Sequence, residues 1–223
     1  MRPITLNVAY GAATADAIAQ DQTLAAAGSL TLDGSLVQNT TPLSPYENVA
    51  PVPVAFISPP SFVTIVSIND LSLVNFTITG TDSNGRAITE VVVGPNNETV
   101  STTNTFATVS SISADDAAAD VSACVNSGGN TSWIPLDIYV KNQVTDIQVT
   151  EVSGTMTYSM VYTNNDPFDT SITHTEVAID STLTSATTSI NYQSTKVMRA
   201  VKLKVASGSE GSLRVVITQQ SIV

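Results

Sequence analysis

Apolar and polar residues alternate along most of this chain, and this period of two constrains the fold more than any other feature of the sequence. In 74–79, Val, Phe and Ile occupy every second position, and Asn and Thr occupy the positions between them. The same alternation recurs in 134–140, 156–162 and 197–205. Successive side chains of a β-strand point to opposite faces of its sheet, so each run predicts a strand with one buried face. We therefore expect an all-β protein.

Clusters of turn-forming residues separate these runs. They occur at 80–85, 94–97, 164–167 and 208–211. Gly, Asn and Asp tolerate the positive φ angles of tight turns, and short turns join neighbouring antiparallel strands. The pattern predicts two tandem antiparallel β-sandwich units, at 58–126 and 131–223. Ser127–Asn130 is the candidate linker between them.

Residues 1–57 are expected to form an extended, Pro-rich N-terminal arm. Six of the ten prolines lie between positions 42 and 60, and proline lacks the N–H group that a central strand must donate. The Ala-rich stretch 12–27 has helical propensity, but its weak apolar pattern predicts at most a short helix. Such an arm runs over a surface or bridges to a neighbouring molecule.

Core positions follow from the apolar face of each run. In the first unit we expect Val66, Phe76, Ile78, Val91 and Phe106 to be buried. In the second unit we expect the same of Leu136, Ile138, Tyr158, Val201, Leu203, Val215 and Ile217. Cys124 is the only cysteine, so no disulfide forms within the chain, and we expect it to fill a core position as a small hydrophobic residue.

The composition argues against several classes of partner. Hydrophobic residues make up 42% of the chain and charged residues only 12%, with a net charge of −11. An acidic chain repels phosphate, so we expect neither nucleic-acid binding nor binding to an anionic membrane. The start of the sequence lacks the pattern of a signal peptide, and no apolar run approaches the length of a transmembrane helix, so neither is expected.

The sequence carries no recognisable catalytic or metal-binding motif. His174 is the only histidine, and neither a nucleophile elbow nor the spacing of a zinc site accompanies it. Asp82-Ser83-Asn84-Gly85 lacks the spacing of a calcium loop and is interpreted as a hairpin turn. Asp115, Asp116 and Asp120 are interpreted as a solvated acidic loop rather than a weak calcium site. We expect no enzyme activity, no metal and no cofactor.

Charge is distributed unevenly. Five of the eight basic residues fall in 196–223, which contains only one acidic residue, Glu210. A basic end can pair with the acidic body of a neighbouring copy, whereas the simpler alternative is a solvated face of a hairpin. The candidate interface residues are Pro51, Pro53, Trp133, Lys196, Arg199, Lys202, Lys204 and Arg214.

Several short segments of the sequence, in this order, resemble segments of structural proteins of tailed-bacteriophage virions. They are 76–85, 88–90, 93–96, 106–112, 133–137, 153–154 with Tyr158 and Tyr162, 166–168, 199–203 and 215–220. The resemblance covers about residues 61–220 and implies assembly on a capsid or tail, with no catalytic residues to transfer.

The resemblance does not fix the location on the particle, and our leading hypothesis is a capsid decoration or cement protein that stabilises the head through oligomeric contacts. Its implied partners are copies of itself, in a trimer or higher symmetric oligomer, and other virion proteins such as the major capsid or tail proteins. Its implied location is the virion, assembled in the bacterial cytoplasm. The alternatives are a neck, tail or fibre-base protein and a carbohydrate-binding host-adhesion module.

Overall fold

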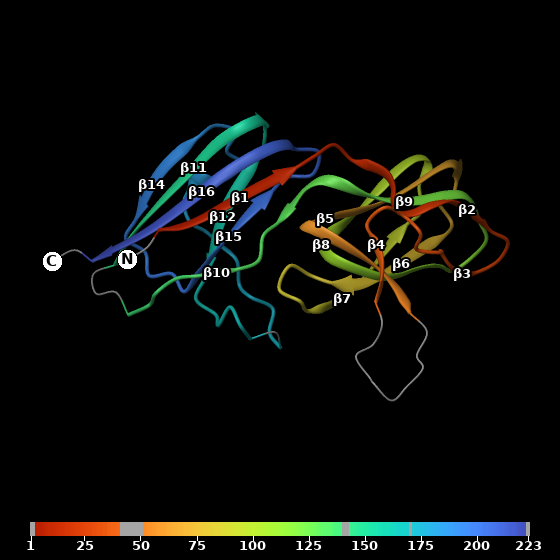
Figure 1. The fold of residues 1–223 in the computed structure, drawn as a ribbon, viewed down its shortest axis with the longest axis horizontal. Coiled ribbons are helices and arrows are strands. Elements are labelled where there is room, and N and C mark those ends of the chain that lie inside the picture. The colour runs from red at the N-terminus through yellow and green to blue at the C-terminus, as the bar shows by residue number, and fades with distance from the viewer. Residues whose placement is uncertain (1–2, 41–50, 140–142, 170, 222–223) are drawn as a thin grey trace. The chain divides into compact units, whose positions relative to one another are not determined.

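A computed structural model of the chain describes residues 3–40, 51–139, 143–169 and 171–221. It confirms the all-β prediction, because the strands pair into antiparallel sheets of four and twelve strands (Figure 1). The described residues contain no α-helix, and the one helical turn is the 3₁₀ segment η1 (Ser181–Leu183). They also contain no helix long and apolar enough to cross a lipid bilayer.

The strands are β1 (Ile4–Tyr10), β2 (Thr14–Leu24), β3 (Gly28–Ser29), β4 (Val37–Thr40), β5 (Val52–Asp70), β6 (Asn75–Thr81), β7 (Ala87–Val93), β8 (Asn96–Ala114), β9 (Ala118–Asn130), β10 (Ile134–Pro135), β11 (Gln143–Thr155), β12 (Tyr158–Thr163), β13 (Val177–Ala178), β14 (Ile190–Ser194), β15 (Ala200–Val205) and β16 (Glu210–Ser221).

The chain divides into two compact units. Residues 13–126 form one, which we call the central unit, and residues 1–12 together with 127–223 form the other, which we call the terminal unit. The structure differs from the expected order of an arm followed by two tandem units, since the central unit is inserted between the first strand and the rest of the terminal unit. Ser127–Asn130, which we expected to be a linker, instead forms the end of strand β9.

In the central unit, strands β9, β5, β8, β6 and β7 follow one another across the sheet. The short strands β3 and β4 pair with β8 and β5, and β2 pairs irregularly with β9. The core is built from the apolar faces of these strands, and its largest buried side chains are Phe76, Phe106, Ile18, Ile65, Ile78 and Ile112. Two segments of the expected arm, β2 and β4, are thus ordinary parts of this sheet.

The Ala-rich stretch forms strand β2 rather than a short helix. Ala17, Ile18 and Ala19 are all buried, and Ala19 pairs with Ala123 of β9. Small side chains allow the close packing seen here, and this tertiary contact overrides the helical propensity of alanine.

Strand β5 is central in the sheet although it contains Pro53, Pro59 and Pro60. The pairing of β5 with β8 shifts register between Phe56 and Ser61, where Pro59 and Pro60 lie. A register irregularity removes the need for regular N–H donors at these positions, which explains how prolines enter a central strand. Pro42 and Pro45 lie outside the described residues.

In the terminal unit, the four-stranded sheet has the order β1, β16, β11, β14. Strands β10, β12 and β13 join β15, directly or in turn, in the second set of strands. Both sets contribute to one core, whose largest buried members are Tyr158, Ile147, Met156, Met160, Ile179 and Leu183.

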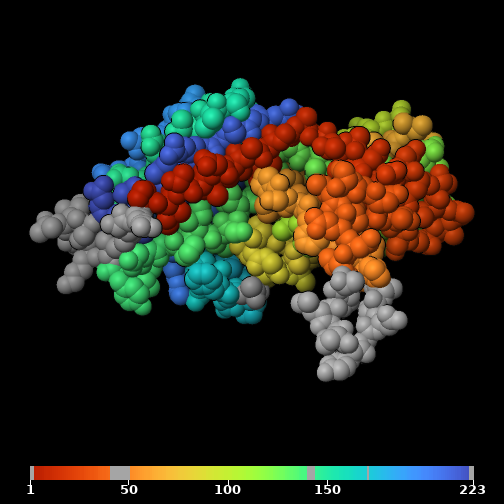
Figure 2. Space-filling view, viewed as in Figure 1, coloured from red at the N-terminus to blue at the C-terminus, as the bar shows by residue number. Residues whose placement is uncertain are grey.

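Residues 4–10, the start of the expected arm, form an edge strand of this sheet. β1 pairs with β16 from Ile4 opposite Ile217 to Tyr10 opposite Gly211. Figure 2 shows the red N-terminal strand lying against the blue C-terminal strand. Val8 and Tyr10 are buried in the core of the terminal unit, so the N-terminus contributes to its packing.

Most core predictions are confirmed, and three are not. Val91 and Ile138 are exposed, and Val66 is only half-buried. Val91 belongs to β7, whose alternate residues 87, 89, 91 and 93 all face solvent, so the prediction chose the wrong face of that strand. Ile138 lies beyond the end of β10, where the alternation no longer follows a strand. Cys124 is buried as expected.

Candidate functional site

The predicted basic face is formed by strand β15. Lys202 and Lys204 alternate with Val201, Leu203 and Val205, which are buried in the core of the terminal unit. Because side chains alternate across a strand, both lysines project from the opposite, outer face of the sheet. Val161 of the neighbouring strand β12 lies opposite Lys202 and packs on this outer side with Trp133 and Ala200.

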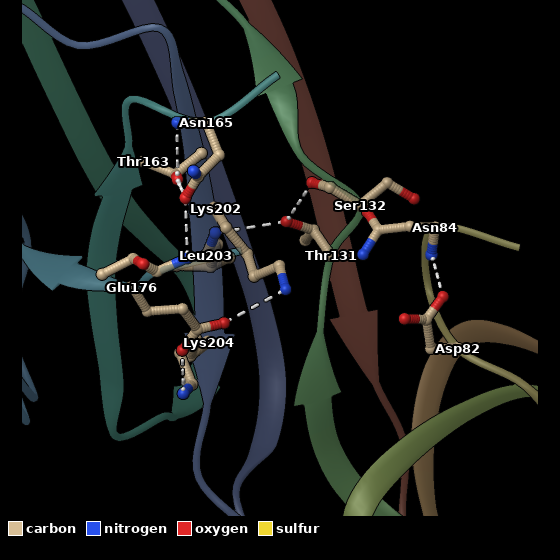
Figure 3. Close-up of polar contacts among 11 residues, drawn as sticks. Asp82, Asn84, Thr131, Ser132, Thr163, Asn165, Glu176, Lys202, Leu203 and Lys204 are labelled. Atoms are coloured by element: carbon tan, nitrogen blue, oxygen red, sulfur yellow. Dashed lines mark hydrogen bonds and ion pairs between the residues drawn. The ribbon is translucent and has the colours of Figure 1, made fainter. Parts of the chain in front are cut away.

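One carboxylate binds both lysines. Glu176 precedes β13, and its Oε1 and Oε2 lie 3.2 Å from Lys202 Nζ and 2.6 Å from Lys204 Nζ (Figure 3). The Lys202 side chain is only 8% exposed, against 40% for Lys204. Burial raises the pKa of Glu176, but hydrogen bonds and positive charge from Lys204 and Lys202 outweigh burial and hold that pKa below its ordinary value.

Trp133 packs against the same lysine. Its ring centre lies 4.6 Å from Lys202 Nζ, within the range of a cation–π interaction. The indole also makes a tilted contact with His174 at 5.7 Å between ring centres. Trp133 is buried in this arrangement. It is therefore part of the unit's own packing, whereas the sequence predicted an interface residue.

Residues in 164–169 and 171–178 supply further polar contacts of the terminal unit. His174 Nε2 lies 2.7 Å from the Asp166 carbonyl oxygen, which can only accept, so this nitrogen donates. Arg199 forms an ion pair of 2.8 Å with the Asp166 carboxylate. Asn165 accepts a hydrogen bond from the backbone of Thr175 and closes the loop. His174, expected in a polar loop, is therefore a buried structural contact.

The remaining predicted interface residues are Lys196, Arg214, Pro51 and Pro53. Lys196 donates to the Ile179 carbonyl oxygen, and its ammonium lies 5.8 Å from the Tyr162 ring centre. Arg214 is exposed on β16 of the four-stranded sheet. Pro51 is exposed, and Pro53 pairs with Asn39 in β4 within the central unit. The predicted set is thus divided between the two units.

The two groups of acidic residues weighed as calcium sites make local hydrogen bonds. Asp82 accepts the N–H groups of Asn84 and Arg86, which confirms a hairpin turn. Asp115 accepts two hydrogen bonds from Asn75, and these lower the pKa of Asp115. Within the described parts of the chain, no group of three or more His, Cys, Asp or Glu side chains is arranged to hold a metal ion.

The sequence reasoning missed the exposed apolar strand β7. Val91 and Val93 are 59% and 54% exposed, although Val91 was predicted to be buried. Three consecutive valines at 91–93 obscure the alternation that would have shown which face is buried. Only the position of β7 at the end of its sheet reveals this surface.

A scan against protein-family models finds no match, and a search of curated protein sequences finds no significant match.

Proposed function

We propose that this chain is a structural component of a bacteriophage virion and acts as a capsid decoration protein on the head. In this role it forms a symmetric oligomer and contacts the major capsid protein. Each of its two units has its own apolar core. The chain adds contact surface between capsid subunits and mechanical stability to the head, rather than catalysis.

The observation that carries the proposal is the position in the fold of the segments that resemble virion proteins. The segment 76–85 with 88–90 spans the β6–β7 hairpin, and 106–112 lies in β8, where 108–112 pairs with β6 and Phe106 pairs with β5. In the terminal unit, 133–137 and 199–203 meet where β10 pairs with β15. These segments therefore form paired strands in both units, as expected if the resemblance reflects a shared fold.

The source of stability also supports a structural role. The only cysteine is buried and unpaired, so no disulfide holds either unit. Each unit has its own apolar core, and the mostly buried Lys202 is paired within the chain. Such a protein suits assembly in the reducing bacterial cytoplasm, where packing rather than disulfides must supply stability.

Carbohydrate binding receives less support from the described surface. Sugar sites commonly use exposed aromatic rings as stacking platforms, and tryptophan serves this purpose best. The only tryptophan, Trp133, is buried and contacts Lys202 and His174, although Tyr139 and Phe168 are exposed. A host-adhesion role corresponds to labelling of the tail or fibre base in the following experiment.

Immunoelectron microscopy tests the proposal directly. Antibodies raised against the purified chain are applied to intact phage particles, with pre-immune serum as the control. Labelling distributed over the head supports a decoration protein. Labelling confined to the neck, tail or fibre base places the chain there and overturns the head assignment. Intact and disrupted particles that both remain unlabelled overturn the virion role.

A further inference from the structure

Strand β7 forms one edge of the sheet in the central unit. It pairs with β6 from Asn75 opposite Val93 to Thr81 opposite Ala87, and it ends the strand order (Figure 1). Among the described residues, no strand pairs with its other side. A row of outward backbone groups on an edge strand is a template for pairing with a further strand.

The backbone hydrogen bonds at the two ends of the β6–β7 ladder show which residues point their backbone groups toward this edge. At one end of the ladder Gly94 N–H donates to the Val74 carbonyl, and at the other end Asp82 N–H donates to the Arg86 carbonyl. In an antiparallel ladder, hydrogen-bonded pairs alternate with non-bonded pairs. Even-numbered residues of 86–94 thus bond to β6. The backbone groups of residues 87, 89, 91 and 93 point toward the open edge.

The same four residues present an uncharged surface. Ala87, Thr89, Val91 and Val93 are all exposed, and none of them carries a charge. Natural edge strands commonly prevent association with lysines, prolines or inward-pointing charges. This edge lacks those devices on its exposed face. The strong β-propensity of Thr and Val further favours an added strand.

The two charges nearby identify the occupant. Arg86 and Glu90 lie on the other face of the strand, four residues apart. Antiparallel pairing of two copies about Ile88 sets Arg86 of each copy opposite the partner's Glu90, and the same register pairs the outward backbone groups of Ala87 and Thr89. Opposite charges facing each other across two strands stabilise the pair. Pairing about Glu90 instead opposes like charges.

We infer that two copies of this chain associate through their β7 strands, antiparallel and related by a two-fold axis at Ile88. The interface is isologous, because the same strip of each copy meets its counterpart. The Glu90 carboxylate already accepts the N–H groups of Thr103 and Asn104, which fixes its position for the partner's Arg86. This inference rests on the proposed function, since it identifies the surface by which copies of a structural subunit meet.

Sedimentation equilibrium of the purified full chain tests the inference. The native chain is expected to shift from monomer to dimer as its concentration rises into the millimolar range. Thr89→Lys places a charge at the centre of the edge and is expected to weaken dimerisation at least tenfold. Thr89→Val keeps the dimer. Val152→Lys adds the same charge on exposed β11 of the terminal unit and is expected to leave the dimer unchanged.

Disulfide trapping tests the register. Residues in a hydrogen-bonded antiparallel pair lie about 5.5 Å apart at Cα, within reach of a disulfide. Ala87→Cys mixed with Thr89→Cys is expected to crosslink faster than Val93→Cys with itself. The native Cys124 is buried, so crosslinking of the unsubstituted chain gives the background rate.

Each outcome decides the inference. A native chain that stays monomeric at the highest concentration overturns it, as does a Thr89→Lys variant that dimerises like the native chain while keeping a native circular dichroism spectrum. Fastest crosslinking at Val93 overturns the register. A chain that is monomeric in solution but still labels phage heads would remove the β7 interface and leave the assignment to the phage head intact, so the two failures are distinguishable.

Discussion

Lys202 and Glu176 form an ion pair on the outer face of the terminal unit, and the Lys202 side chain is only 8% exposed. Trp133 covers the same ammonium from the side. A lysine that looked from the sequence like a free docking residue is therefore held within its own unit.

Removing the Glu176 charge is expected to destabilise the terminal unit. Glu176→Gln leaves the buried ammonium of Lys202 without its anion, and an under-compensated buried charge costs about 1–3 kcal/mol. Urea unfolding followed by the fluorescence of Trp133, which contacts Lys202, measures the change. Asp166→Asn is the control. Its pair with Arg199 is about 40% exposed on both sides, and loss of such a pair costs less than about 1 kcal/mol.

The same pair predicts a pH dependence. The pKa of Glu176 is lower in the folded chain than its ordinary value of 4.5, so the folded state binds this proton more weakly than the unfolded state. The stabilisation is therefore complete above pH 4.5 and is lost as the pH falls through the folded pKa. Urea midpoints of the native chain and Glu176→Gln should converge as the pH falls below 4.5. A constant difference down to pH 3 contradicts this mechanism.

Cys124 is expected to resist modification in the folded chain. Burial, with a smaller contribution from the negative charge of Asp16, raises the pKa of this thiol to about 11. The thiol therefore stays protonated and shielded near neutral pH, whereas only the thiolate reacts readily. A colorimetric thiol reagent at pH 8 should titrate one thiol per chain rapidly in urea and far more slowly in buffer. Rapid reaction in buffer contradicts the burial.

The hydroxyl of Tyr158 is expected to stabilise the terminal unit. It donates to the Thr188 carbonyl at 2.7 Å, and burial raises the pKa of this tyrosine to about 12. Tyr158→Phe removes the donor and is expected to lower the free energy of unfolding by about 1 kcal/mol. Tyr139→Phe is the matched control, because Tyr139 is exposed. Equal effects of the two substitutions on the urea midpoint would count against the hydrogen bond.

The sequence predicted the local structure better than the long-range pairing. The alternation at 74–79 located β6, and the Asp82–Gly85 turn correctly joined it to β7. No local pattern, however, indicates that Ile4 pairs with Ile217, because strand partners far apart in sequence are selected by tertiary packing. This explains why residues 4–10 were expected in an arm.

The candidate interface shows the same limit. The clustering of basic residues near the C-terminus was visible in the sequence, but their partners Asp166 and Glu176 come from a loop whose path the sequence does not specify. Conversely, the exposure of Val91 depends on β7 lying at the end of a sheet. Strand order, rather than composition, decides which surface remains open.

Quantitative mass spectrometry of purified phage particles tests the central claim most directly. The copy number of this chain is measured relative to the major capsid protein after density-gradient purification. A head decoration protein repeats with the symmetric capsid lattice, so the account predicts hundreds of copies per particle, in a fixed ratio to the capsid protein. Absence of the chain from intact particles would contradict the account.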